Sequence, residues 1–323
     1  MKHKFMEDIK MKLVIIEPLG VEKEKLLSMA AEALNNNVEI IYYDTKVTDT
    51  ETLIQRGKDA DIIAVSNLAL NSDVINGCKN LKLLSVAFTG VDHIAMDTCK
   101  KNGVMVCNCA GYSTAAVADL VFGMIITLYR NIIPCNKVTR EEGTKDGLIG
   151  FELEGKKFGV IGTGAIGMRV ANIAKAFGCE VYAYSRTVKE TPGITYADLD
   201  TLLSTCDILS VHTPLNESTK ALINAEKIAL MKKNAIIINT ARGPIIDSNA
   251  LAKALNSGKI AGAGIDVFEK EPPIGEDHPL LHAPNTVVTP HIGFATKEAL
   301  VKRAVIVFDN IVKWLENKPQ NVM

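Results

Sequence analysis

Three ionisable side chains in the second half of the chain each follow a strand-like apolar run. Arg242 interrupts the sequence IIINTARGPII at 236–246, Glu271 stands directly before two prolines, and His291 follows Pro290. An arginine binds a carboxylate and polarises a carbonyl, a histidine protonates a developing alkoxide, and a nearby glutamate raises the pKa of that histidine. Together the three predict the reduction of a 2-oxo acid. Taken singly, His291 also fits a core histidine and Glu271 a surface charge.

A glycine-rich turn earlier in the chain predicts the reductant. The sequence GVIGTGAIG places Gly162, Gly164 and Gly167 in G-x-G-x-x-G register, after a strand-like run and at the start of a helical one. In that setting the glycines allow a tight turn, close approach of a diphosphate, and close contact of helix and strand. The diphosphate would lie on the N–H groups of the helix that starts near Ala165 and Ile166. We therefore expect a bound nicotinamide dinucleotide.

The strand after this helix ends in a stretch that bears on the choice of cofactor. An acidic residue normally stands there and binds the ribose 2′-hydroxyl of NAD. Here the stretch reads Ser185, Arg186, Thr187. A hydroxyl followed by an arginine suits a 2′-phosphate, which favours NADP(H). NAD(H) remains the second reading, with Arg186 as a solvated loop charge.

These candidate residues need a scaffold, and the chain alternates short apolar runs with amphipathic helical stretches. Such alternation predicts parallel sheets with right-handed crossovers, in which ligands bind at the carboxyl ends of the strands. We expect two Rossmann-like α/β lobes, each a mainly parallel sheet flanked by helices, with the active site in the cleft between them. The expected strands are 12–18, 38–44, 61–66, 81–87, 103–108, 157–162, 180–185, 206–214, 234–241 and 259–268.

The domain boundaries follow from where the two series of elements meet. We assign 11–110 and 297–323 to a substrate-binding (catalytic) domain and 111–296 to a dinucleotide-binding domain. The segment 134–155 contains four glycines and little periodicity, so we expect a loop there. Residues 1–10 are polar and are interpreted as a disordered lead before the first strand.

Composition excludes several classes of partner. With 36 basic and 37 acidic residues, the chain has no net field to attract nucleic acid or an anionic membrane. The longest apolar run, 115–128, contains Asp119 and Gly123 and is too short to cross a bilayer. Seven scattered cysteines favour a reducing compartment. We expect a cytoplasmic protein with no nucleic-acid or membrane partner, and no metal, since Pro279 disrupts the only H-x-x-x-H pattern.

Five segments of this sequence resemble the D-isomer-specific 2-hydroxyacid dehydrogenases, a family that includes hydroxypyruvate and glyoxylate reductases. The resemblance covers nearly the whole chain from Met11. It implies hydride transfer between a nicotinamide cofactor and a small 2-oxo acid or D-2-hydroxy acid, with hydroxypyruvate or glyoxylate as the first expectation. The segments are GVIGTGAIG, DILSVHTPLNEST (207–219), MKKNAIIINTARGPIID (231–247), GAGIDVFEKEPP (262–273) and HPLLHAPNTVVTPHIGFAT (278–296).

The same resemblance assigns roles to individual residues. It implies that Arg242 contacts the substrate carboxylate and carbonyl, that His291 donates the proton, and that Glu271 assists His291. The turn at Thr89 and Gly90 matches the one that grips the substrate carboxylate in the family. Further cofactor-binding residues implied at the strand ends are His212, Thr213, Pro214, Thr240, Ala241, Asp266, which would hold the nicotinamide carboxamide, and Gly293.

Two further expectations concern assembly and a competing class of function. The helix at 115–130 is apolar nearly all round, and the family uses this region for a two-fold dimer, so a homodimer is expected. The same fold also serves as a dinucleotide-sensing corepressor, which retains the catalytic residues. A binding protein of that kind is the alternative to an enzyme.

Overall fold

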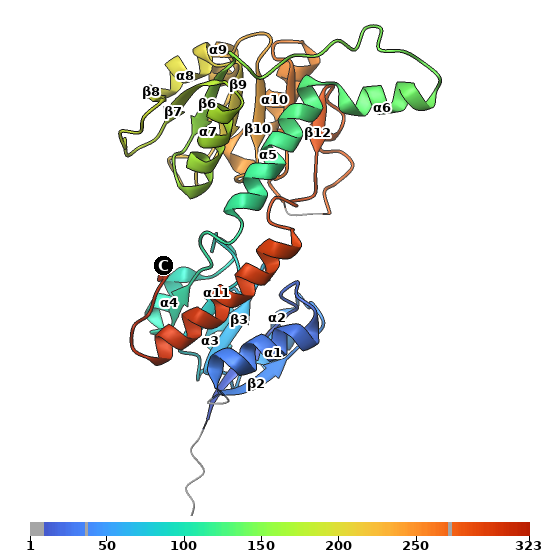
Figure 1. The fold of residues 1–323 in the computed structure, drawn as a ribbon. Helices are drawn as coiled ribbons and strands as arrows, with labels where there is room; N and C mark the ends of the chain where they lie inside the picture. The colour runs from blue at the N-terminus through green and yellow to red at the C-terminus, as the bar shows by residue number, and fades with distance from the viewer. Residues whose placement is uncertain (1–9, 36–37, 271–272) are drawn as a thin grey trace, which may run out of the picture. The chain divides into compact units, whose positions relative to one another are not determined.

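The computed structural model describes residues 10–35, 38–270 and 273–323, and the chain forms two compact units (Figure 1). Unit 1 contains the chain up to Ser113 together with Thr296–Met323, and unit 2 contains Thr114–Ala295. Glu271, which the sequence puts forward as the partner of the catalytic histidine, lies outside the described residues. Each unit is described by itself.

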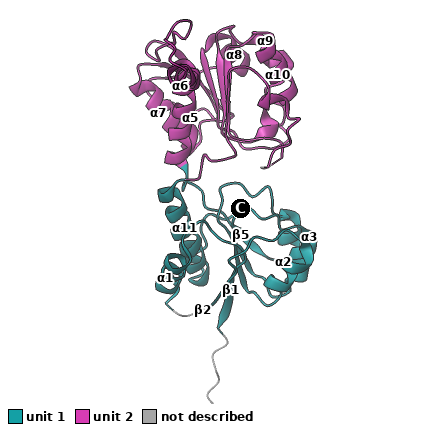
Figure 2. Cartoon of the chain, turned by 90° about the vertical axis from the view of Figure 1, so that its right-hand side faces the viewer, with its two compact units in different colours: residues 1–113, 296–323 teal, residues 114–295 magenta. Residues whose placement is uncertain are grey.

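Unit 1 is built on a five-stranded parallel sheet in the order β2-β1-β3-β4-β5. Its central strands are buried on both faces, as the continuous apolar runs predict for a parallel sheet. Helices α1 and α11 cover one face and α2, α3 and α4 the other (Figure 2). The elements are β1 Met11–Ile15, α1 Lys23–Leu34, β2 Val38–Tyr42, α2 Thr50–Gly57, β3 Ile62–Val65, α3 Ser72–Gly77, β4 Leu83–Val86, α4 Met96–Lys101, β5 Met105–Cys107 and α11 Lys297–Leu315.

Unit 2 is built on a seven-stranded parallel sheet in the order β12-β11-β10-β9-β6-β7-β8. Helices α5 and α7 pack on one face, while α8, α9 and α10 pack on the other (Figure 2). The strand order reverses between β6 and β9, the kind of switch point where open α/β sheets bind ligands. The elements are α5 Thr114–Tyr129, α6 Ile132–Arg140, β6 Lys157–Ile161, α7 Ala165–Ala176, β7 Glu180–Tyr184, β8 Ile194–Tyr196, α8 Leu199–Thr205, β9 Ile208–Val211, α9 Ala225–Leu230, β10 Ile236–Asn239, α10 Ser248–Asn256, β11 Gly262–Ile265 and β12 Thr286–Val288.

The predicted fold class, two α/β lobes built on parallel sheets, is confirmed. Two elements depart most clearly from the expectations. Helix α6 falls in the segment expected to be a loop, and it buries none of its residues, so no apolar stripe marks it in the sequence. Strand β8 has three residues at the edge of the sheet, which is too short for a recognisable pattern.

The strands are shorter at their carboxyl ends than the apolar runs predict. The run 206–214 contains β9 only at Ile208–Val211, and the run 259–268 contains β11 only at Gly262–Ile265. The remaining residues of each run leave the sheet and, apart from the exposed Pro214, stay partly or wholly buried in loops. These loops carry most of the candidate site.

No single helix in the described part of the chain is long and apolar enough to cross a bilayer. Only α5 and α6 taken together reach the required length and hydropathy, and the chain bends by 57° where they meet.

Candidate active site

The candidate cofactor and catalytic residues of unit 2 that the structure describes follow the carboxyl ends of its strands. Gly162 comes directly after β6, Ser185 after β7, His212 after β9, Thr240 after β10 and Asp266 after β11. Arg242 and His291 each stand three positions after the last residue of β10 and β12. Because β10, β11 and β12 are neighbours in the sheet, the structure brings these loops together along one edge.

The three glycines of the turn after β6 meet three different constraints. Gly162 has a φ of +100°, and a Cβ there would lie 2.7 Å from the carbonyl oxygen of His212. A Cβ on Gly167 would collide with the carbonyl oxygen of Gly162, so helix and strand meet backbone to backbone. Gly164 is the N-cap of α7 and opens onto free space, with no side-chain cap on the helix. This open helix N-terminus is suited to a diphosphate.

Two buried hydroxyl groups point to a ligand at the neighbouring strand ends. The Oγ1 atoms of Thr213 and Thr240 are buried and have no hydrogen-bond partner within the described chain. Leaving a buried hydroxyl unsatisfied costs about 1–3 kcal/mol, so such atoms are rare unless a ligand or water completes them. Together with the glycine turn, these hydroxyls fit a dinucleotide lying across the ends of β6, β9 and β10.

The turn that carries Arg242 is fixed by a buried side chain. The Nδ2 of Asn239 donates to the carbonyl oxygen of Arg242 at 3.0 Å, and its Oδ1 accepts from the N–H of Ala241 at 3.0 Å. A Cβ on Gly243 would collide with the backbone of Phe268, which follows β11. The half-buried Arg242 is therefore presented by a turn with little freedom, and its Nη1 donates to the carbonyl oxygen of Ala241 at 2.7 Å.

The loop that carries His291 is organised by Asp266. Its buried carboxylate accepts from the Thr289 hydroxyl at 2.6 Å, the Ile292 N–H at 2.7 Å and the Gly293 N–H at 2.8 Å. Desolvation raises the pKa of Asp266, opposed by these hydrogen bonds and by the charge of His291. His291 itself has a φ of +57°, a conformation that costs a non-glycine residue energy unless its surroundings impose it. Asp266 supplies that constraint.

His212 is held as a neutral imidazole. Burial lowers its pKa to about 3. Its Nε2 lies 2.8 Å from the Oγ of Ser210, which is completely buried in β9. An uncharged ring beside the glycine turn suits the adenine side of a cofactor and is unsuited to proton donation near neutral pH.

The stretch after β7 differs from the packed loops around it. Ser185 is half-buried, whereas Arg186 and Thr187 are exposed. The structure therefore places the arginine and both hydroxyls where a ligand at the end of β7 can reach them, and no carboxylate stands among them.

The second acidic residue near the catalytic loop, Glu269, has a structural partner. Its Oε2 lies 2.9 Å from the Nε2 of His278. Although desolvation opposes it, hydrogen bonds from Ser248 and His278 lower the pKa of Glu269. His282 likewise bonds a backbone carbonyl, that of Glu276, at 2.6 Å. The two histidines of the H-x-x-x-H pattern are therefore engaged with protein groups.

In unit 1, the predicted carboxylate-gripping turn follows β4. Thr89 is exposed and Gly90 half-buried. Asn108, a buried residue after β5, fixes this turn, because its Nδ2 donates to the Thr89 carbonyl oxygen at 2.8 Å. Asn108 is in turn fixed through its own carbonyl oxygen, which accepts from the Nδ2 of Asn310 in α11 at 2.8 Å.

Several residues that shape these loops were not singled out from the sequence: Asn239, Thr289 and Asn108. Asn239 left a usable signal, because it is a polar residue at the end of an otherwise apolar buried strand. The role of Asp266 as the organiser of the His291 loop left none, because its partners lie 23 to 27 positions further along the chain.

Comparison with known proteins agrees with this geometry. The family described as "D-isomer specific 2-hydroxyacid dehydrogenase, NAD binding domain" matches residues 122–293, within unit 2. A hydroxypyruvate reductase of Blautia hydrogenotrophica is 36% identical over 97% of this chain and 99% of its own length. A glyoxylate reductase of Thermococcus litoralis is 35% identical over 88% of this chain and 89% of its own.

Solved structures give the same result. An acyclic imino acid reductase in complex with NADPH and D-Arg superposes with a TM-score of 0.88 at 30% identity, covering 97% of this chain and 100% of that one. The chain belongs to the D-isomer-specific 2-hydroxyacid dehydrogenase family. It is an oxidoreductase that moves a hydride between a nicotinamide cofactor and a 2-oxo acid or D-2-hydroxy acid. The alternative of a dinucleotide-sensing binding protein is not favoured, because the relatives are named as reductases.

Proposed function

We propose that this enzyme reduces hydroxypyruvate or glyoxylate to the corresponding D-2-hydroxy acid or glycolate. The observation that carries the proposal is the pair of constrained loops at one sheet edge, which hold Arg242 after β10 and His291 after β12, the two strands on either side of β11. The named relatives reduce these two substrates, and a small 2-oxo acid needs little beyond a carboxylate clamp and a proton donor.

Each residue has a stated role in the proposed reaction. The guanidinium of Arg242 binds the substrate carboxylate and polarises the C2 carbonyl. Thr89 and Gly90 bind the same carboxylate through their backbone, and His291 delivers a proton to the oxygen on C2. Glu271 is proposed to stabilise the protonated form of His291. When bound, the nicotinamide supplies the hydride that C2 receives.

Steady-state reduction of a panel of glyoxylate, hydroxypyruvate, pyruvate and longer 2-oxo acids tests this assignment. We expect the first two to have the highest kcat/KM. Arg242→Ala should lower kcat/KM by several kcal/mol of transition-state stabilisation, because the substrate carboxylate loses its partner. Near-normal turnover by that variant, with the fold intact by circular dichroism, would contradict the proposed role of Arg242.

For the cofactor, we propose that Asp266 holds the carboxamide and that Ser185, Arg186 and Thr187 favour NADP(H). The support is the exposed arginine flanked by two hydroxyls with no carboxylate among them. A charge-assisted bond to the 2′-phosphate contributes about 1.5–3 kcal/mol, roughly ten- to a hundredfold in affinity. NADPH should therefore be used at least as well as NADH, and Arg186→Ala should weaken NADPH alone. A strong preference of the wild type for NADH would show that Arg186 faces only solvent.

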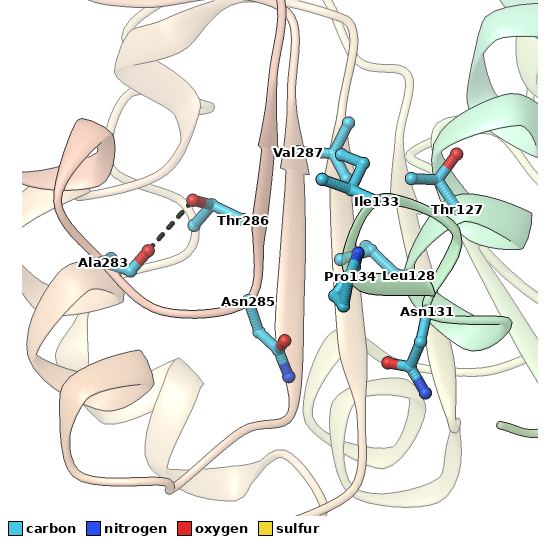
Figure 3. A pocket seen from close by; sticks show the side chains of 9 residues that line it. All are labelled: Thr127, Leu128, Asn131, Ile133, Pro134, Ala283, Asn285, Thr286 and Val287. Atoms are coloured by element: carbon cyan, nitrogen blue, oxygen red, sulfur yellow. Dashed lines mark hydrogen bonds between the residues drawn. The ribbon is translucent and has the colours of Figure 1, made fainter. Parts of the chain in front are cut away.

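The proposed assembly is a homodimer through the α5–α6 region. Ile132 and Ile133 are 45% and 56% exposed, and Ile149 and Phe151 further along are 84% and 51% exposed. Of these residues, Ile133 also lines a pocket of about 190 Å³, where the start of α6 faces β12 (Figure 3). Exposed apolar side chains in such number mark an interaction surface. Light scattering at micromolar concentration should give about twice 35.0 kDa, and a monomer mass would refute the dimer.

A reducing, cytoplasmic location is also proposed. All seven cysteines are free thiols, and six of them are buried. Thiols that persist without pairing are typical of reducing compartments.

A further inference from the structure

One carboxylate in unit 2 bonds three segments that meet beside the Arg242 turn. Glu269 follows β11, and its Oε2 lies 2.9 Å from the Nε2 of His278. Desolvation alone would raise the pKa of Glu269, but hydrogen bonds from Ser248 and His278 lower it. Ser248, 7% exposed, begins α10, the helix that follows the Arg242 turn. Glu269 therefore links the segments after β10, after β11 and before β12.

The hydrogen bonds of His278 determine which ring nitrogen carries the proton. Its Nδ1 accepts from the N–H of Leu280 at 3.4 Å, at the start of the short 3₁₀ helix Pro279–Leu281. A neutral ring whose Nδ1 accepts carries its proton on Nε2, the atom that faces Glu269. His278, with its side chain 15% exposed, is therefore the donor to the carboxylate.

The ring of His278 also contacts Phe268, the residue before Glu269. The two rings meet edge to face, with their centres 5.0 Å apart and their planes at 89°. Phe268 is 5% exposed and belongs to the same apolar core as the buried face of α10. Its position is therefore set by the apolar core and by the ring of His278.

The backbone of Phe268 packs directly against the turn that carries Arg242. A Cβ on Gly243 would collide with the carbonyl carbon and oxygen of Phe268, so the two main chains are in contact there. Arg242 is the residue before Gly243, and it is half-buried. A displacement of Phe268 would therefore move Gly243 and change the direction of the guanidinium.

We propose that Glu269 and His278 are positioning residues that hold Phe268 against Gly243 and so fix the direction of Arg242. The inference rests on the role that the proposed function gives to Arg242. Neither residue takes part in proton or hydride transfer. A guanidinium that is displaced by about 1 Å polarises the C2 carbonyl less well, and displacements of that size lower rates by up to about a hundredfold.

The exposure of Glu269 separates this role from a purely structural one. Its side chain is 43% exposed, and a hydrogen-bonded ion pair between exposed groups contributes little to the free energy of unfolding. Loss of the contact should therefore lower kcat while the midpoint of urea unfolding changes little.

A pair of substitutions at His278 tests the inference in the full-length enzyme, with the 2-oxo acid that it reduces best. His278→Gln keeps an N–H that reaches Glu269 and should keep most of the wild-type kcat. His278→Asn keeps an acceptor for the Leu280 N–H but is too short to reach Glu269, so kcat should fall by about tenfold, the size of one hydrogen bond. Equal values of kcat in the two variants would overturn the inference.

The affinity for the reduced cofactor provides a second measurement on the same variants. The glycine turn after β6 lies outside these contacts, so the Kd from fluorescence titration should match that of the wild type in both. A Kd that rises together with the fall in kcat would show a general disturbance of unit 2 and overturn the inference.

His282 is a matched control in the segment before β12. Its Nε2 lies 2.6 Å from the carbonyl oxygen of Glu276, so this bond joins two residues of one segment. His282→Asn should leave kcat as in the wild type. A fall as large as in His278→Asn would show that loosening this segment is sufficient, and the inference would be wrong.

A double-mutant cycle tests whether Glu269 acts through Arg242. Glu269→Ala should lower kcat/KM by about tenfold in the wild-type background and have little further effect in Arg242→Ala, because the side chain that it positions is gone. Equal losses in both backgrounds would contradict the inference. If Glu269→Ala fails to fold, the two His278 variants decide. Near-normal turnover by Arg242→Ala alone would instead remove the proposed function of the arginine.

Discussion

The two sheets end in loops that are held in different ways. In unit 2, the side chains of Asn239 and Asp266 hold two of the loops, and backbone also packs against backbone at Gly162, Gly167 and Gly243, where a Cβ would meet a neighbouring main chain. In unit 1, single buried side chains hold the loops by hydrogen bonds to the loop backbone, as Glu17 and Asn108 do. Both kinds of loop stand at the carboxyl ends of parallel strands.

The difference matches the two kinds of ligand proposed for the two units. A dinucleotide presents the same phosphates and carboxamide in every turnover, and a rigid main chain binds such a constant group well because little freedom is lost on binding. A substrate pocket must differ between enzymes of one reaction class. Where one side chain fixes a loop, a single substitution can change the conformation of that loop without changing the sheet that carries it. The following predictions test that contrast, from the largest expected effect to the smallest.

Gly243→Ala should have the largest effect. The added Cβ collides with the backbone of Phe268, which cannot move without shifting the end of β11. We expect a loss of at least about 3 kcal/mol in the free energy of unfolding and loss of activity with every 2-oxo acid. Urea unfolding and steady-state kinetics measure the two effects.

Gly164→Ala is its control, since the Cβ there enters open space. Stability should change by less than about 1 kcal/mol, while cofactor affinity falls because the methyl group occupies the place of the diphosphate. If Gly243→Ala were as stable as Gly164→Ala, the idea of a rigid main-chain edge in unit 2 would be wrong.

Asn239→Ala and Asn108→Ala compare the two edges directly. Each removes a buried amide that bonds a loop carbonyl, and each should cost about 1–3 kcal/mol of stability. Asn239→Ala should mainly lower kcat, because it releases the turn of Arg242. Asn108→Ala should mainly raise KM, because the contact proposed between Thr89 and the substrate carboxylate would be equally strong in the ground and transition states. The reverse pattern in the kinetics would contradict the assignment of roles.

His212 should make the edge of unit 2 sensitive to acid. Its pKa of about 3 in the folded protein lies below the ordinary value of 6.5, so the unfolded chain binds the proton first. The contribution to stability is present above about pH 6.5 and is lost as the pH falls toward 3. Between pH 7 and pH 5 the loss is about 2 kcal/mol. His212→Gln should therefore lose about 2 kcal/mol less than the wild type in urea unfolding over this range, and parallel pH profiles would show that the ring is not desolvated.

Much of the architecture was readable in the sequence. The apolar runs at 61–66 and 234–241 predict strands buried on both faces, and the helical stretch after Gly164 predicts a helix with an open N-terminus. The sequence failed at α6 and β8, where no periodic apolar face exists because neither element packs much of its surface.

The sequence by itself determined which loops carry the candidate catalytic residues, because parallel strands end at one edge and Arg242 and His291 each follow a strand. Only the tertiary structure decided how those loops are held. Asp266 organises the His291 loop and Glu17 fixes the loop after β3 through hydrogen bonds that join residues 23 to 51 positions apart. Local patterns of hydropathy and turn residues predict the secondary structure of each segment, but they do not predict contacts between distant segments. The donors that bond a buried carboxylate come from segments that are distant in the sequence. They meet the carboxylate only when separate strands pack side by side, so its role can be assigned only in the folded chain.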